Sequence, residues 1–185
     1  MKILGLHGYQ TSSSIFKMQG RYLMSLLNKK YNQKIEWIIP DAPNLSNNNI
    51  SPIVKKCFKP PYYHWYRTNE YNNELDKSID YLKQFKNIDG IISFSQGSCL
   101  SYLLSDILNP KFIINICGVN NIKNKYQIEI PSLHLIGKED PIKFKSVLLT
   151  ENYINPYIIY HKGSHSFPPD KESYQEIINF IEKNY

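Results

Sequence analysis

The sequence predicts an α/β protein built on a single parallel sheet. Short runs of apolar and β-branched residues alternate with longer segments in which apolar residues recur at helical spacing. The short runs are apolar at nearly every position, which is typical of strands that are covered on both faces. Six strands are expected, at residues 2–6, 35–39, 90–94, 112–117, 132–136 and 157–161. Strand–helix alternation of this kind favours parallel strands with helices on both faces of the sheet.

Five segments between and after these strands are expected to be helical. They are residues 15–30, 70–86, 96–108, 143–151 and 171–184. The second segment has the clearest pattern, because Leu75, Ile79 and Leu82 fall on one face of a helix. The last segment repeats this spacing. We find no internal repeat, and residues 1–185 are expected to form one domain.

Residues 41–70 break the alternation. This stretch is rich in Pro and Asn and ends in a cluster of aromatic residues that includes Tyr62, Trp65 and Tyr66. A connection of this length without periodicity is usually functional or mobile. We therefore expect this segment to form a flap over the carboxyl ends of the strands, and we expect the aromatic residues of the flap to line an apolar substrate pocket. The sequence leaves a second interpretation open, in which Trp65 and its neighbours form a satellite core that anchors an irregular loop.

Composition and charge exclude several classes of protein. The chain has 185 residues and a net charge of +6, but its lysines are scattered rather than grouped in a stripe, so nucleic-acid binding is not expected. Cys57, Cys99 and Cys117 form no C-x-x-C pair, which disfavours a metal site or a disulfide framework. Neither a signal peptide nor an apolar run of about 18 residues is present, so we expect a cytoplasmic protein without membrane insertion. The oligomeric state is left open.

Four polar stretches follow predicted strands. "HGYQTSS" follows the first, "SQGS" the third, "GKEDP" the fifth and "KGSHSFPPD" the sixth. The carboxyl ends of parallel strands lie at one edge of a sheet, where ligands bind in open α/β folds. Although these stretches lie far apart in the chain, the predicted fold brings them together, which indicates a functional site.

The stretch after the third strand resembles a nucleophile elbow. That motif, G-x-S-x-G, lies between a strand and a helix, and its small residues permit a strained turn that exposes the serine hydroxyl. Here the motif is Ser93-Phe94-Ser95-Gln96-Gly97, with a serine in place of the first glycine. Both the preceding strand and the following helix are predicted, so Ser95 is a candidate nucleophile.

A serine hydroxyl becomes a nucleophile when a histidine takes its proton and an acid orients that histidine. In folds with this elbow the partners follow in the order Ser, Asp or Glu, His. Asp140 follows the fifth strand and His165 lies in the loop after the sixth, so both are candidates in the right order. Glu139 and Asp170 remain rival acids.

The negative oxygen of a tetrahedral intermediate requires hydrogen-bond donors. In this architecture one donor is the backbone N–H of the residue after the nucleophile, here Gln96. The second comes from the loop after the first strand, where Tyr9 is the natural candidate. We expect His7 to shape this loop by hydrogen bonding rather than to act as a second base.

Taken together, these motifs resemble the family serine hydrolase (FSH) group of small α/β-hydrolases over nearly the whole chain. The matching stretches, in the order of the family, include "ILGLHGYQTSSSIF", "PDAP", "ISFSQGSCL", "PSLHLIGKEDPI" and "HKGSHSFP". The elbow of the family usually reads GFSQG, so Ser93 is a departure. The resemblance implies six parallel strands in the order 2-1-3-4-5-6 and an enzyme without metal or organic cofactor.

The resemblance assigns a role to each site residue. It implies Ser95 as the nucleophile, Asp140 as the acid and His165 as the base, with the backbone of Tyr9 and Gln96 binding the oxyanion. The expected function is a serine esterase that cleaves small-molecule esters of apolar acyl or alkyl groups through an acyl-enzyme.

The sequence also has three other possible interpretations. An acyl thioesterase with the same triad is the nearest alternative, because acyl-protein thioesterases share the "FSQG" elbow, although their aspartate and histidine stretches look less similar. An inactive hydrolase fold that binds a ligand or a protein is the next alternative. A nucleotide-binding Rossmann-like domain is disfavoured, because "HGYQTSS" lacks the G-x-G-x-x-G glycines.

Overall fold

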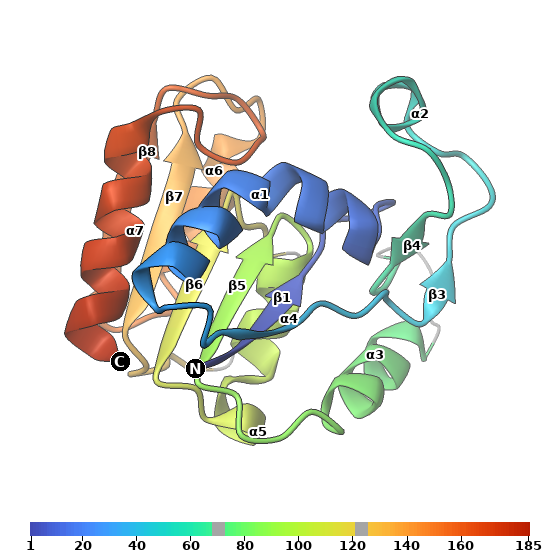
Figure 1. Ribbon diagram of the computed structural model, residues 1–185. Coiled ribbons are helices and arrows are strands. Elements are labelled where there is room, and N and C mark those ends of the chain that lie inside the picture. Colours follow the sequence, from blue (N-terminus) through green and yellow to red (C-terminus); the bar gives the residue numbers. More distant parts are fainter. Residues whose placement is uncertain (68–72, 121–125) are drawn as a thin grey trace.

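A parallel sheet of six strands forms the centre of the computed structural model, which describes residues 1–67, 73–120 and 126–185 (Figure 1). The strands are β1 (Lys2–Leu6), β2 (Glu36–Ile38), β5 (Gly90–Phe94), β6 (Phe112–Ile116), β7 (Ser132–Gly137) and β8 (Tyr157–His161). Their order is β2-β1-β5-β6-β7-β8, and every neighbouring pair is parallel. Counted along the chain, these six strands have the predicted order 2-1-3-4-5-6, so the predicted fold is confirmed.

Helices cover both faces of the sheet (Figure 1). The helices are α1 (Ser13–Lys30), α3 (Glu74–Leu82), α4 (Gly97–Leu103), α5 (Ser105–Leu108), α6 (Lys143–Thr150) and α7 (Lys171–Asn184). On one face α1 and α7 pack against the strands in a core that includes Leu23 and Ile177. On the other face α3, α4 and α6 contribute Leu82, Leu100 and Leu149 to a second core. The inner strands β1, β5, β6 and β7 are buried on both faces, which explains why most of their residues are apolar.

Two predicted helices differ from those observed. The helix expected at 96–108 is divided into α4 and α5, with Leu104 between them. Near the break, the Ser101 hydroxyl donates to the carbonyl of Ser98, and Ser105 donates to that of Tyr102. Serine hydroxyls that bond to nearby helical carbonyls bend and weaken helices. The helix expected at 70–86 is α3, and residues 70–72 lie outside the described residues.

The segment from residue 41 onward contains a small hairpin. It consists of β3 (Asn44–Leu45) and β4 (Tyr63–His64), which pair antiparallel, with the short helix α2 (Pro52–Cys57) between them. In Figure 1 this unit lies beside the main sheet. The Tyr63 N–H donates to the carbonyl of Thr11, which ties the hairpin to the loop after β1. Residues 68–70 of the predicted flap lie outside the described residues.

None of the helices in the described parts of the chain combines the length and the apolar character that crossing a bilayer requires.

Candidate active site

Ser95 lies in a strained turn at the carboxyl end of β5. Its φ angle is 51°, in the left-handed region that residues other than glycine rarely adopt. The turn is held because the Ser95 N–H donates to the carbonyl of Ile116, while its own carbonyl accepts from Ser98 and Val119, each at 3.1 Å. The side chain is nearly buried, with 9% of the residue exposed. The backbone therefore fixes the hydroxyl at the edge of the sheet.

The small residues of the elbow have separate structural roles. A Cβ atom at Gly97 would overlap the carbonyl of Leu6, so the helix can approach β1 only with glycine there. Ser93 replaces the first glycine of the motif and is fully buried. Its hydroxyl donates to Asn115 Oδ1 at 2.7 Å and lies 2.7 Å from the Ser98 hydroxyl. The departure at Ser93 is thus accommodated by a buried polar network beneath the turn.

A hydrogen-bonded chain joins Ser95, His165 and Asp140. His165 Nε2 lies 2.9 Å from Ser95 Oγ, and His165 Nδ1 lies 2.7 Å from Asp140 Oδ2. The other carboxylate oxygen of Asp140 accepts the N–H of Ile142 at 2.8 Å, and the residue is 2% exposed. With the ring proton on Nδ1, the imidazole donates to Asp140 and Nε2 is left to accept the serine proton. This arrangement can move a proton from Ser95 to His165.

The two rival acids lie elsewhere. The Glu139 side chain is exposed. The backbone carbonyl of Glu139 accepts a hydrogen bond from the hydroxyl of Ser164. Asp170 accepts the N–H of Ser173 at 3.0 Å and caps the start of α7. Among the described residues, the carboxylate hydrogen-bonded to His165 is that of Asp140.

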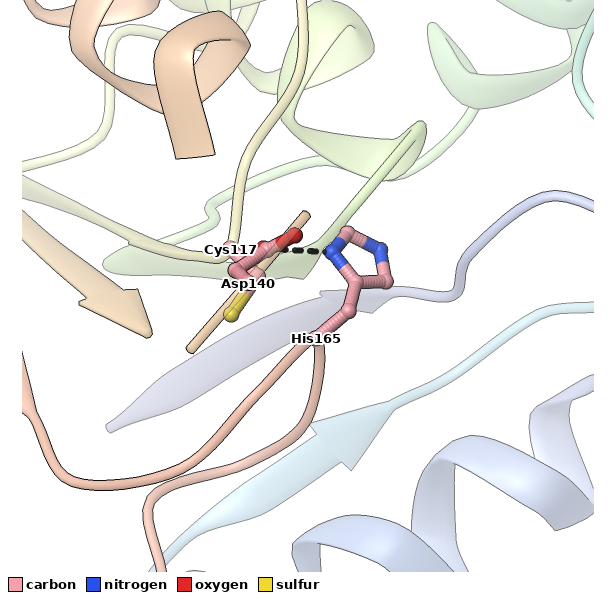
Figure 2. A group of neighbouring side chains, drawn as sticks. All are labelled: Cys117, Asp140 and His165. Carbon is pink, nitrogen blue, oxygen red and sulfur yellow. Dashed lines mark hydrogen bonds and ion pairs between the residues drawn. The ribbon is translucent and has the colours of Figure 1, made fainter. Parts of the chain in front are cut away.

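Cys117 lies next to the hydrogen-bonded side chains of Asp140 and His165, at the carboxyl end of β6 (Figure 2). Ligand atoms of Cys117, Asp140 and His165 all lie within 4.8 Å of one another, a spacing that could hold a metal ion. Burial, however, raises the pKa of the Cys117 thiol to about 12. The thiol is therefore protonated at neutral pH. Figure 2 also shows Asp140 and His165 bonded to each other, so this group suits proton transfer better than metal binding.

The thiol of Cys117 instead contacts the loop after β8 that carries His165, here called the histidine loop. Its sulfur lies 3.4 Å from the carbonyl oxygen of Ser166 and 3.6 Å from that of Ser164. These carbonyls flank His165 in the chain. The S–H group can donate a weak hydrogen bond to either of them, so Cys117 supports the backbone that carries the imidazole.

The expected oxyanion donors also lie beside Ser95. Tyr9 and Gln96 line the same cavity as Ser95 and His165. Within the described ranges, neither of their backbone N–H groups donates a hydrogen bond to the protein, so both are available to a ligand. Gln96 also precedes the first residue of α4, where the helix dipole favours negative charge.

His7 shapes the loop that carries Tyr9. Its Nδ1 donates to the carbonyl of Gly8 at 2.8 Å, and its Nε2 accepts the N–H of Ala42 at 3.0 Å. Complete burial lowers the pKa of His7 to about 4, so the ring is neutral at pH 7. Both ring nitrogens are occupied, which fits a structural residue rather than a second base.

The cavity beside Ser95 has a volume of about 430 Å³ and a mixed wall. Tyr66, Val119 and Ile142 provide apolar surface, while Arg67 and Lys145 provide positive charge. Sequence reasoning missed Arg67 and Lys145. Val119 and Ile142 lie shortly after β6 and β7. Because ligands bind at the carboxyl ends of parallel strands, the sequence could have identified Val119 and Ile142.

The structure corrects the prediction for two of the three aromatic residues. Trp65 is 0% exposed, its ring packs 4.9 Å from that of His7, and its Nε1–H donates to the carbonyl of His7 at 2.8 Å. Tyr62 is buried in a small cluster with Ile15 and Ile50. Neither lines the cavity, because Trp65 belongs to the second core of the sheet and Tyr62 to this separate small cluster. Tyr66 is the one that contacts the cavity.

The family model described as Serine hydrolase (FSH1) matches residues 1–177. The chain is 26% identical to the esterase AGAP003155 of Anopheles gambiae over 214 aligned positions, covering 98% of this chain and 77% of the relative. It is 25% identical to the esterase FPY3 of Fusarium mangiferae, covering 91% of this chain and 88% of the relative.

Solved structures share the fold. The crystal structure of esterase PE8 matches with a TM-score of 0.61 at 15% identity, covering 100% of this chain and 92% of that chain. The carboxylesterase of Bacillus cereus matches with a TM-score of 0.62 at 13% identity, covering 100% of this chain and 88% of that chain. At such low identity these likenesses show the fold alone.

Proposed function

This chain belongs to the serine hydrolase (FSH1) family, and from that premise we propose that it cleaves carboxylic esters through an acyl-enzyme on Ser95. An ester-cleaving serine hydrolase is the function that the family and its esterase-named relatives support. The finer proposal is that Ser95 is the nucleophile, His165 the general base and Asp140 the acid that orients it. The observation that carries it is the pair of hydrogen bonds, at 2.9 and 2.7 Å, that join the three side chains.

Acylation begins when His165 Nε2 takes the proton of the Ser95 hydroxyl. Ser95 Oγ then forms a bond to the carbonyl carbon of the ester, and the carbonyl oxygen becomes negative. The buried carboxylate of Asp140 stabilises the imidazolium that forms. Collapse of the intermediate breaks the bond to the alcohol oxygen, which takes the proton from His165 and leaves as the free alcohol.

The backbone N–H groups of Tyr9 and Gln96 are the proposed donors to the negative oxygen. Their support is that both line the cavity beside Ser95 and that neither is used within the described protein. Each such donor typically stabilises the transition state by about 2.7–4 kcal/mol.

Deacylation repeats these steps with water. His165 removes a proton from a water molecule, whose oxygen attacks the acyl carbon and forms a second tetrahedral intermediate. The bond from that carbon to Ser95 Oγ then breaks, and His165 returns the proton to the serine. The products are the carboxylic acid and the free enzyme.

We further propose that the acyl or alkyl group of the ester is apolar. The support is the surface of Tyr66, Val119 and Ile142 in the cavity wall. Residues 1–185 are proposed to act as one domain, since one sheet carries the site, and to act in the cytoplasm without nucleic acid. The three cysteines are free, which agrees with a reducing compartment.

The test is hydrolysis of 4-nitrophenyl acetate, butanoate and octanoate by purified variants, beside the thioester butanoyl-thiocholine. Ser95→Ala is expected to lower kcat by a factor on the order of 10⁶, which in practice is loss to background. Asp140→Asn should lower kcat by about 10⁴, because the imidazole tautomer is no longer fixed. Asp170→Asn is the matched control and should retain activity. Substantial ester hydrolysis by Ser95→Ala would contradict the proposal.

A further inference from the structure

The outer edge of β8 is less protected than the opposite edge of the sheet. Among the described strands, β8 pairs with β7 alone, so one side of its backbone is open to a further strand. Its five residues, Tyr157–His161, include no Asp, Glu, Lys or Arg. At the opposite edge β2 has three residues, of which Glu36 forms an ion pair with Lys2. Because short length and charged side chains usually protect edge strands, the edge at β8 is the one suited to pairing with another chain.

The helix next to β8 turns an apolar face outward. α6 packs against β7, and two of the three side chains that it buries are hydroxyls, those of Ser146 and Thr150. Phe144, Val147 and Leu148 are exposed, and their spacing of three and four positions places them on one face of the helix. A surface helix of a monomer usually shows the reverse pattern, with apolar residues inward and polar residues outward. The outer face of α6 is therefore suited to a partner molecule.

The edge strand and the helix form one continuous surface. Tyr160 of β8 lines the same groove as the three exposed apolar residues of α6. Ile158 lies two positions before Tyr160 and therefore on the same face of the strand. The name β8–α6 surface is used below for six apolar side chains that are each 38% to 57% exposed: Phe144, Val147, Leu148, Tyr157, Ile158 and Tyr160.

The area of the β8–α6 surface fits a dimer. At half exposure each of its three aromatic side chains offers about 100 Å² and each aliphatic one about half as much, which amounts to roughly 450 Å². Apolar atoms make up about 57–65% of protein interfaces, so this amount corresponds to about 700–800 Å² on each copy. Each partner buries about 800 Å² in a stable interface of standard size. A second copy of this chain would therefore supply enough contact for a specific dimer.

We propose that the β8–α6 surface is the interface of a symmetric dimer, in which β8 pairs antiparallel with β8 of a second copy. Donors and acceptors of antiparallel strands face one another, so a strand related to its mate by a two-fold axis is its own complement. This axis is perpendicular to the sheet and keeps both α6 helices on one face of a continuous sheet of twelve strands. There the second copy covers the outward side chains of each helix. The inference does not depend on the proposed function.

Pairing at β8 leaves both active-site cavities open. β5, the strand that leads to Ser95, is three strands inward from β8, and at about 4.8 Å per strand it lies about 14 Å from the interface. The two-fold axis reverses the strand direction, so the carboxyl ends of the two sets of strands lie at opposite ends of the joined sheet. Loss of the dimer should therefore leave ester hydrolysis per chain unchanged.

Sedimentation equilibrium of the purified protein tests the proposal. We expect a particle of twice the chain mass with a dissociation constant in the micromolar range or below. Ile158→Lys places a charge in the interface twice and should raise that constant by about a hundredfold or more, since like charges in an interface are costly. Leu148→Lys should act in the same way from α6. The matched control is Ile107→Lys on α5, where the isoleucine is 43% exposed, and it should leave the constant unchanged.

Cysteine cross-linking locates the contact. Facing Cβ atoms of antiparallel strands are about 4.5–5.5 Å apart, close to the distance that a disulfide spans. Single cysteines are placed in turn at positions 157, 158, 159 and 160, in a Cys57→Ser background that removes the exposed native thiol. On oxidation at least one of these four variants should form a dimer that dithiothreitol separates, whereas Ile107→Cys should not. The absence of a disulfide at all four positions would rule out the strand pairing.

Three further results would overturn the inference. One is a wild type that stays monomeric at every concentration, and another is a dimer that both Ile158→Lys and Leu148→Lys leave intact. The third is a monomer that binds vesicles of phosphatidylcholine and phosphatidylserine and loses this binding in Leu148→Ser, because the surface would then serve a lipid bilayer. Circular dichroism shows whether each variant is folded. Since none of these measurements uses ester hydrolysis, failure of the inference is distinguishable from failure of the proposed function.

Discussion

At the scale of single residues, the site depends on where four neighbouring strands end. Ser95 follows β5, Cys117 follows β6, Asp140 follows β7 and His165 lies in the loop after β8. Because these strands are adjacent in the sheet, their ends bring together side chains that are up to 70 positions apart. Three of these residues could be identified from the sequence, because each is a polar residue just after an apolar strand.

Cys117 could not be assigned in the same way. In the sequence it ends an apolar run, and a small buried residue explains that position equally well. Its contact with the histidine loop depends on how that loop folds back over β6, which apolar periodicity does not report. Only the structure shows its sulfur beside the carbonyls of Ser164 and Ser166.

We predict that Cys117 is a positioning residue for His165. Cys117→Ala removes the S–H contacts beneath the loop and should lower kcat about tenfold with little change in KM, since small misplacements of a catalytic group are costly. Cys117→Ser keeps a donor and should restore most of the activity. The matched control is Cys57→Ala, which changes an exposed cysteine. Wild-type kcat in Cys117→Ala would contradict this role.

At the scale of elements, the hairpin is built into the active edge. The Trp65 backbone N–H donates to Gln96 Oε1 at 3.0 Å, and Gln96 Nε2 donates to the carbonyl of Tyr66 at 2.7 Å. The Trp65 indole bonds to His7, in the loop that carries Tyr9. The hairpin therefore connects the elbow to the proposed oxyanion loop.

Removal of the indole N–H of Trp65 should lower kcat/KM by the same factor for short and long esters. Trp65→Phe leaves the carbonyl of His7 without its partner, which should cost about 1–3 kcal/mol of unfolding free energy. Because Trp65 lies outside the cavity, kcat/KM for acetyl and octanoyl esters should fall by the same factor. Urea unfolding and ester hydrolysis measure the two effects.

The matched control is Trp37→Phe, which removes an indole bond from β2 to Asn28 of α1, where neither residue lines the cavity. This variant should lose stability without a comparable loss of activity. A loss confined to octanoyl esters in Trp65→Phe would instead favour an aromatic substrate pocket.

The hairpin was the least predictable element. Strands of two residues, such as β3 and β4, are too short to show an alternating pattern. The break between α4 and α5 was missed for a related reason, since the bonds of the serine hydroxyls do not alter the apolar spacing. Long, strongly periodic segments such as α1 and α7 were predicted to within about two residues at each end.

At the scale of the whole molecule, the two faces of the sheet explain why the fold could be predicted. Strands buried on both faces are apolar at most positions, so β5, β6 and β7 stand out in the sequence. The parallel arrangement of β5 and β6 agrees with the helices α4 and α5 that separate them in the chain. The order of the strands came from the family resemblance, because apolar patterns do not specify which strands are neighbours.

Burial in this fold also links its stability to pH. Burial lowers the pKa of His7 to about 4 and that of His134 to about 3, and it lowers the pKa of His161 in the same direction. An unfolded histidine titrates near 6.5. Below that pH the unfolded chain binds more protons than the folded protein, so stability is present above pH 6.5 and is lost as the pH falls.

Between pH 6.5 and 5, we predict a loss of about 2 kcal/mol for each of His7 and His134. Urea unfolding at a series of pH values measures it. The variant His134→Gln cannot be protonated, so its unfolding free energy should fall less steeply over this interval than that of the wild type. Parallel curves for the two proteins would contradict the assignment. Glu74 does not confuse the result, because its carboxylate, with a pKa of about 2, loses its contribution only at lower pH.

The central claim is that Ser95 is the nucleophile of this hydrolase, and fluorophosphonate labelling tests it most directly. In this reaction Ser95 Oγ forms a bond to phosphorus and fluoride leaves, so a stable adduct marks the activated serine. We predict that peptide mapping by mass spectrometry finds the adduct on Ser95 in the wild type, and finds no adduct in folded Ser95→Ala. A folded wild type that takes up no label, or takes it up at another serine, would contradict the account.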